Sequence, residues 1–204
     1  MRLTELDTRP DKQARLTNLA LSSLVLNAVA FGADGLYAKI ATAYSEWMLN
    51  TKLWVDWNNM PKHRWERGGY PAFVIALFRL WNGDSVKVAA EGLGSLGPYR
   101  SCLDNWENES GMVAAILEMC DYHIAHAFHK ASQFQEFEFP PYDILPVEYL
   151  ALRQVRRKLG LPTPKPKHVL LDTPFADPPD PLPEVHDELL DRAIAAVREL
   201  IPDL

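Results

Sequence analysis

One segment limits the fold of this chain more than any other: residues 72–81 are apolar almost all round. Tyr70-Pro71 precedes this segment, and proline suits the first turn of a helix. Asn82-Gly83-Asp84 follows it and is a typical helix stop. A helix that is apolar on every side must be surrounded by other elements. We therefore predict a central helix around which the rest of the chain packs.

Apolar residues recur at helical spacing through most of the chain. They predict further helices at about residues 11–31, 33–48, 85–93, from 99 onward, 113–128, 145–159 and 184–200. No alternation of strand, turn and helix is present, so the all-α class fits better than α/β. With 204 residues, 48% of them hydrophobic, the chain can bury one sizeable core. We predict a single helical domain over residues 1–204, built as an irregular bundle or as stacked helical hairpins.

Two connections interrupt this helical pattern. Phenylalanine and glutamate alternate over residues 134–139 before Pro140-Pro141, which predicts an extended connection or a short edge strand. Residues 162–183 form a long proline-rich connection, which we expect to be either an ordered wrap over the helices or a mobile loop.

The charge of the chain is unevenly distributed. Residues 1–102 carry 12 Lys/Arg and 9 Asp/Glu, and residues 103–204 carry 9 and 18, so the halves stand at +3 and −9. Seven carboxylates without any Lys or Arg among them account for much of this excess: Asp172, Asp177, Asp180, Glu184, Asp187, Glu188 and Asp191. Carboxylates held open toward solvent attract a basic partner.

The overall composition excludes several partners. A net charge of −6 argues against nucleic acid, which needs a clustered basic face. The densest basic group, at residues 153–158, is expected to be the solvated last turn of a helix. The apolar segment at 19–32 is shorter than the roughly 20 residues of a membrane span. Two cysteines give no disulfide framework, so we expect a cytoplasmic protein without membrane partners.

Catalytic motifs are weak throughout. His123, His126 and His129 follow at three-residue steps, but a zinc site needs three or four ligands, usually from more than one element. His186-Asp187 is the dipeptide of metal-dependent phosphohydrolases, with histidines upstream and Asp191 four residues on. It also falls in the first turn of the predicted last helix, where acidic residues suit the helix dipole. The glycines at 92–97 match no nucleotide-binding loop. We predict no catalytic residue, no metal and no cofactor, and keep a metal-dependent hydrolase that uses the histidines as the alternative.

Aromatic and acidic residues together suggest an interface. Tryptophans crowd residues 47–65 among charged side chains, and residues 137–143 combine aromatic, acidic and proline residues. Such mixtures are typical of interface anchors, although the same rings could simply pack on the core. The residues that we predict to contact a partner are Trp54, Trp57, Glu136, Glu138, Tyr142, Asp143, Asp172, Asp177 and Asp180.

The run FEFPPYDILPVEYLALRQVRRKLGLPTP, together with LFRLWNGDSVKVAAEGL before it, resembles the all-helical immunity proteins of bacterial polymorphic toxin systems. The likeness covers about residues 70–160. It implies a cytoplasmic antidote that binds and blocks a cognate toxin, and it implies no catalytic residue. The acidic surface is consistent with a toxin whose active-site cleft is basic. A helical adaptor with another protein partner is a further alternative.

Overall fold

A computed structural model describes residues 13–32, 42, 69–93, 95–128, 135–137, 140–179 and 187–200 of the chain. This part is helical and contains no strand, which confirms the all-α class. Its long helices are α1 (Gln13–Ala30), α4 (Tyr70–Trp81), α7 (Glu109–Ala125), α8 (Val147–Lys158) and α9 (Glu188–Leu200). The short ones are α5 (Val86–Ala90), η2 (Gly97–Tyr99), α6 (Arg100–Asp104) and η3 (Pro174–Ala176).

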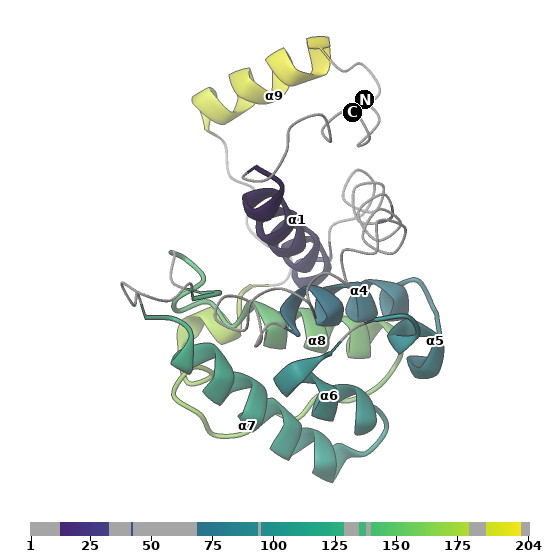
Figure 1. Cartoon of the computed structure of the whole chain (residues 1–204). Helices are drawn as coiled ribbons and strands as arrows, with labels where there is room; N and C mark the ends of the chain where they lie inside the picture. Colours follow the sequence, from purple (N-terminus) through teal and green to yellow (C-terminus); the bar gives the residue numbers. More distant parts are fainter. Residues whose placement is uncertain are drawn as a thin grey trace.

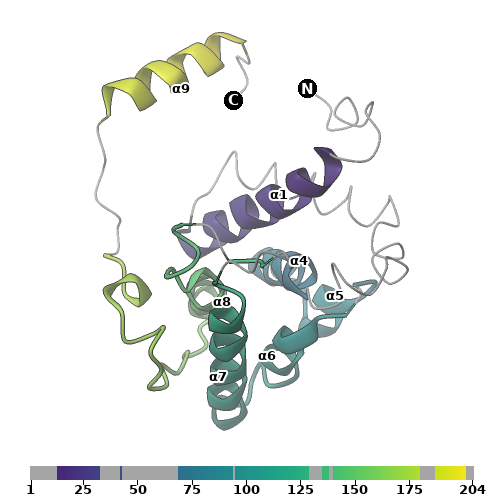
Figure 2. The ribbon, with the colours of Figure 1, turned by 60° about the vertical axis from the view of Figure 1, so that its left-hand side comes forward.

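The helices pack around α4, as its composition predicts (Figure 1). Helix α1 crosses α4 and α8, which themselves lie side by side, while α6 and α7 lie on the far side of these two (Figure 2). In both views α9 stands apart from the other described helices. The core therefore lies between α1, α4, α7 and α8.

Helix α4 is buried along nearly its whole length. Every residue from Tyr70 to Phe78 is buried, together with Leu80. Gly69 caps its first turn, where an added Cβ would lie 1.9 Å from the carbonyl oxygen of Leu96. Arg79, the polar exception, donates hydrogen bonds to the carbonyls that end α5. The local signals at both ends of this helix were sufficient to predict its bounds.

Helix α8 carries the basic residues predicted to form a solvated last turn, and that prediction is wrong for one of them. Arg156 is 1% exposed and lies over the Trp106 ring, 5.4 Å from the centroid. Its guanidinium donates to the carbonyls of Trp106 and Pro162. Lys158 lies 4.0 Å from the centre of the Trp81 ring. Arg156 thus holds neighbouring segments on α8 instead of facing bulk solvent, whereas Arg157 and Lys158 are exposed, as predicted.

We call residues 161–179 the strap. They belong to the proline-rich connection, which was expected to be either an ordered wrap over the helices or a mobile loop. Leu170, Leu171 and Ala176 are buried in the core. His168 lies 3.2 Å from the Asp121 carboxylate on α7, and Arg153 of α8 donates to the Ala176 carbonyl at 3.1 Å. The strap is thus an ordered wrap over the helices.

Helix ends differ from the sequence prediction by a few residues. Helix α7 ends at Ala125 and not at Phe128, because His126 leaves helical geometry as the C-cap. Helix α8 starts at Val147, after Pro146 instead of before it, and α9 starts at Glu188 rather than 184. Residues 135–137 form a turn and no strand. Of the helix predicted at 33–48, only Thr42 lies in the described part, and it is helical.

The described helices also bear on membrane insertion. None of the helices among the described residues combines the length and the apolar character that crossing a membrane requires.

Candidate functional site

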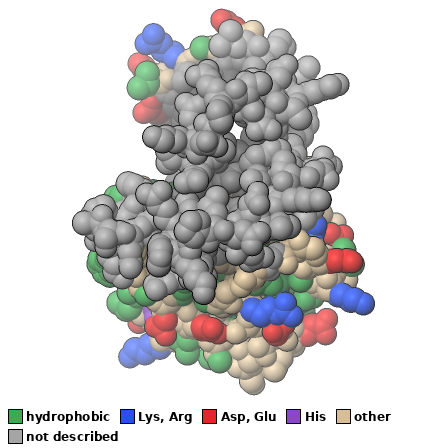
Figure 3. Space-filling model, in the orientation of Figure 1, with side chains coloured by type: hydrophobic (Ala, Val, Ile, Leu, Met, Phe, Trp, Pro, Cys, Tyr) green, Lys and Arg blue, Asp and Glu red, His purple; other side chains and the backbone are tan. Residues whose placement is uncertain are grey.

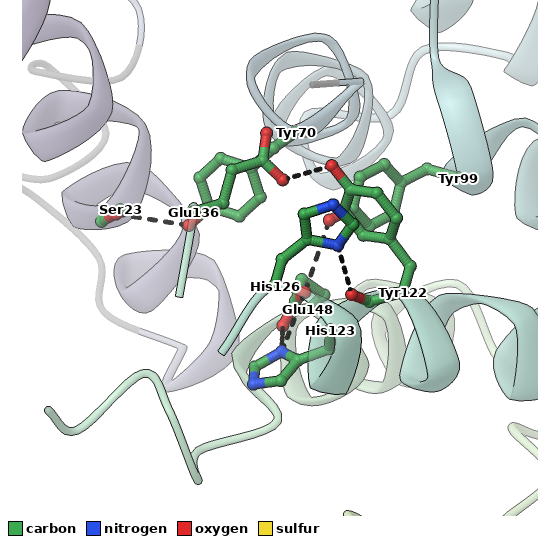
Figure 4. Close-up of polar contacts among 8 residues, drawn as sticks. All are labelled: Ser23, Tyr70, Tyr99, Tyr122, His123, His126, Glu136 and Glu148. Carbon is green, nitrogen blue, oxygen red and sulfur yellow. Dashed lines mark hydrogen bonds and ion pairs between the residues drawn. The ribbon is translucent and has the colours of Figure 1, made fainter. Parts of the chain in front are cut away.

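A buried polar network lies where α7, α8 and η2 meet (Figure 4). Nδ1 of His123 lies 2.9 and 3.1 Å from the two carboxylate oxygens of Glu148, and both side chains are buried. Tyr99 donates its hydroxyl to the same carboxylate at 3.4 Å. Glu148 lies in the first turn of α8 and His123 near the end of α7, so this pair joins two helices whose ends meet.

A second set of contacts lies beside the first. Tyr122 donates its hydroxyl to Oε2 of Glu136 at 2.7 Å. His126 donates from Nδ1 to the Tyr122 carbonyl at 2.7 Å, and the two rings stack with centroids 4.0 Å apart. Residues four apart on a helix share one face, which explains this stacking. His123, one residue after Tyr122, points about 100° away and joins the other set.

Aromatic rings enclose both sets of contacts. Phe137 stacks on His123 with centroids 4.2 Å apart and planes at 9°, and its ring edge meets Tyr70 at 5.4 Å. Tyr99 stacks on Phe73 at 4.5 Å and meets Tyr122 edge-on at 5.8 Å. Water is therefore largely excluded from the Glu148 carboxylate, whereas Glu136 is half-buried.

This enclosure raises the pKa of Glu136, Tyr70 and Tyr99. Burial raises the pKa of Glu136 to about 8, against the lowering effect of the Tyr122 hydrogen bond, and the nearby Glu148 carboxylate raises it further. Burial, reinforced by the same carboxylate, also raises the pKa of Tyr70 and Tyr99 well above the usual value.

The histidine run does not assemble a shared site among the described residues. His123 faces Glu148, whereas His126 lies against Tyr122, so the two rings have different surroundings (Figure 4). Within the described ranges, no group of three or more His, Cys, Asp or Glu is placed to hold a metal ion. His129 and His186 lie outside those ranges. Nε2 of His123 is buried without a hydrogen-bond partner.

Three of the predicted partner contacts hold the chain to its own core. Glu136 is half-buried on Tyr122, as described above. Tyr142 is half-buried and accepts a 2.7 Å hydrogen bond from Asn27 of α1. Asp143 is half-buried, with Oδ1 shielded from solvent and without a hydrogen-bond partner. All three side chains are half-buried against the chain's own body, which agrees with the alternative that this segment packs on the core, and their contact with a partner stays a prediction.

The acidic residues of the strap are exposed, as predicted, but one of them is neutralised. Asp172 and Asp177 are both exposed. Asp177 forms an ion pair with Lys165 and another, of 2.8 Å, with Arg153. Its pKa is lowered, first by the Lys165 hydrogen bond and then by the one from Arg153. The absence of basic residues between Asp172 and Asp191 along the sequence does not prevent pairing across the fold.

Trp54, Trp57, Glu138 and Asp180, the other predicted contacts, lie outside the described residues. Two exposed apolar side chains on the strap were not predicted from the sequence, Val169 at 68% and Phe175 at 46%. An aromatic residue between two aspartates in a proline-rich segment was the available signal for Phe175. The analysis also missed Glu148, because its partners His123 and Tyr99 lie 25 and 49 residues away.

Charged side chains are mixed on the face shown in Figure 3. Among the described residues on this face, Lys and Arg lie between Asp and Glu, without a large field of one sign. Elsewhere in the described part, Arg100 and Asp104 form an exposed ion pair of 2.9 Å.

The network as a whole has the character of an anchor between helices. No protein-family model, curated protein or solved structure matches this chain.

Proposed function

We propose that this chain is an immunity protein, a helical binding protein that occupies the active site of a cognate bacterial toxin and blocks it. One observation carries the proposal: the acidic residues between Asp172 and Asp191 that the structure describes are all exposed. They are Asp172, Asp177, Asp187, Glu188 and Asp191. Exposed carboxylates accelerate the encounter with a basic surface and compete with an anionic substrate for it.

The strap offers the side chains that could prolong such a complex. Val169 and Phe175 are exposed apolar residues on either side of Asp172. Burial of an aromatic ring at an interface contributes more to the lifetime of a complex than an exposed charge does. We name Val169, Asp172 and Phe175 the strap patch, and we propose that it contacts the toxin. Phe175 takes the anchoring role predicted for Tyr142, which is occupied with Asn27.

The finer features of the prediction belong to the same proposal. The chain would form one irregular helical bundle in the cytoplasm, without nucleic acid, membrane or cofactor as partners. The helical and strand-free character of the described part supports such a body. The buried polar groups of the network bond to one another instead of facing a substrate site. This supports a role in binding over one in catalysis.

The proposal is tested with the product of the gene adjacent to that of this chain. Expression of this product in a bacterial host should stop growth, and co-expression of this chain should restore it. If the two proteins bind but growth is not restored, the chain is an adaptor and the immunity proposal fails. If the two proteins do not bind, both the immunity proposal and the adaptor alternative fail for this pair of proteins.

Variants of the strap patch locate the interface. Phe175→Ala should raise the dissociation rate of the complex by an amount equivalent to at least about 2 kcal/mol. Val88→Ala is the matched control, because Val88 is similarly exposed at 45% but lies on α5. Surface plasmon resonance measures both rates, after circular dichroism has confirmed the fold. Equal dissociation rates for wild type and Phe175→Ala would place the interface elsewhere.

A further inference from the structure

The turn between α4 and α5 contains Asn82-Gly83, the one Asn-Gly pair of the chain. Asn82, Gly83, Asp84 and Ser85 are four successive exposed residues, so the turn faces solvent. Glycine has no Cβ, and the amide nitrogen of Gly83 can therefore approach the Asn82 side chain more closely than that of any other residue could. The pair thus brings two groups that can react with each other into an exposed position.

The reaction is an attack of the Gly83 main-chain nitrogen on Cγ of Asn82. A bond forms between this nitrogen and Cγ, and the bond from Cγ to Nδ2 breaks. Nδ2 takes up the proton of the Gly83 amide and leaves as ammonia. Water then opens the resulting five-membered succinimide ring at either of its two carbonyls, which leaves an aspartyl or an isoaspartyl residue at position 82.

The folded turn keeps the reacting atoms apart. The ring is flat, so its closure requires ψ of Asn82 near about −120°, where the Gly83 nitrogen lies on the side of Cβ. The observed ψ is 0°. The Gly83 amide donates to the Leu80 carbonyl at 3.0 Å and the Asp84 amide to the Arg79 carbonyl at 3.1 Å, which fixes this angle. The turn must therefore open before the reaction can take place.

The Arg79 side chain joins the two sides of this turn. Arg79 belongs to the last turn of α4, and its Nη1 donates to the carbonyls of Val88, Ala89 and Glu91 at 3.3, 3.2 and 2.8 Å. These carbonyls lie at the end of α5. The guanidinium thus closes a loop that includes Asn82, and its loss would make the turn open more often.

We propose that Asn82 is a site of spontaneous covalent modification, and that the turn between α4 and α5 controls its rate. The product adds a negative charge at the C-terminal end of α4, where the helix dipole is already negative. An isoaspartyl product also lengthens the main chain by one carbon, so the Gly83 and Asp84 amides cannot both return to α4. Modified molecules should therefore unfold at a lower urea concentration. This inference concerns the chain alone and does not depend on the proposed function.

Mass spectrometry of the protein incubated at mildly alkaline pH tests the site. Trypsin releases residues 80–87, which contain Asn82 and no other asparagine. In the wild type this peptide should gain the mass of an amide-to-acid exchange, at least about tenfold faster in urea than in buffer. Asn82→Gln should gain none in the same time, because its ring would need a sixth member. Asn108 is the internal control, since it is exposed but precedes Glu109 and accepts the Gly111 amide at 3.2 Å.

Arg79→Ala tests the control by the turn. In buffer this variant should react at least about threefold faster than the wild type. Its tryptic peptide, residues 68–87, still has Asn82 as its one asparagine. Arg100→Ala, which removes an exposed ion pair elsewhere, is the matched control and should react as the wild type. Circular dichroism confirms that both variants are folded.

The proposal fails if residues 80–87 gain no mass, or gain it only in urea, since the folded protein would then not react. It also fails if the rates in urea and in buffer are equal, or if Arg79→Ala reacts as the wild type. If Arg79→Ala does not fold, hydrogen exchange in the wild type decides the question. Faster opening at the Gly83 amide than at the Phe73 amide inside α4 supports control by the turn, and equal opening contradicts it.

Discussion

His123 and Glu148 form a buried pair that links α7 to α8, with Nδ1 of the histidine 2.9 Å from the carboxylate. Both side chains are almost fully shielded from solvent. Removal of either partner leaves a polar group without its hydrogen bond in a site closed by Phe137. The pair is therefore a point where small changes in sequence have large effects on stability.

We expect His123→Ala and Glu148→Ala each to lower the free energy of unfolding by about 3–5 kcal/mol, because each variant removes the main partner of a buried polar group. In His123→Ala, the Glu148 carboxylate keeps only the 3.4 Å contact from Tyr99. The double variant should lose less than the sum of the two. Urea unfolding of the four proteins gives the coupling energy. Glu107→Ala, at an exposed site, should leave stability within about 0.5 kcal/mol. Strictly additive losses would show that the two side chains do not depend on one another.

Arg156→Met should lower the free energy of unfolding by about 2–3 kcal/mol. Methionine keeps much of the apolar packing, but it leaves the carbonyls of Trp106 and Pro162 without their donor. Arg100→Ala removes the exposed contact to Asp104 and should cost no more than about 1 kcal/mol. Thermal and urea unfolding compare the two variants. Similar losses would mean that burial of Arg156 has little consequence for stability.

Gly69→Ala should destabilise the protein by about 1–3 kcal/mol, because the new Cβ would lie 1.9 Å from the Leu96 carbonyl oxygen. The backbone of Gly69 has φ −66°, which alanine adopts readily, so the whole effect comes from the close approach. Gly83→Ala is the complementary control. Gly83 has φ 95° and open space around it, so that variant reports backbone strain of about 1–2 kcal/mol. An unchanged Gly69→Ala would show that α4 can move away from Leu96.

Association with the toxin should depend strongly on salt, because exposed carboxylates steer the encounter. Raising the ionic strength from about 0.05 to 0.5 M shortens the Debye length from about 14 to about 4 Å. The association rate should then decrease much more than the dissociation rate increases. Asp172→Asn should slow association modestly, while Asp84→Asn, exposed on the turn after α4, should not. An association rate that is insensitive to salt would exclude steering.

Local signals determined which elements could be predicted from the sequence. The bounds of α4 follow from Pro71 at one end and Asn82-Gly83 at the other, and neither depends on the rest of the fold. The end of α7 was placed too late, because Phe128 continues the apolar pattern after the helix has stopped.

Pairing between distant residues could not be predicted in the same way. In the sequence, the charge of Asp177 has no neighbouring cation, because its partner Arg153 lies 24 residues away. Similarly, the sequence does not show that Glu136 contacts Tyr122, which belongs to another element. Charge counted along a chain measures composition, whereas ion pairing depends on which segments meet. Only the packing of the strap on α8 brings Arg153 to Asp177.

Arg153 and Arg156 lie one turn apart on α8 and bind the strap at two places, near Ala176 and at Pro162. The helix thus holds the proline-rich segment at two points one turn apart. Helix α8 also depends on the strap. A chain cut before Pro162 would keep every helix from α1 to α8 but would deprive the buried Arg156 guanidinium of an acceptor. The strap is therefore required for the stability of the helices, and shortened versions of this protein should end beyond residue 177.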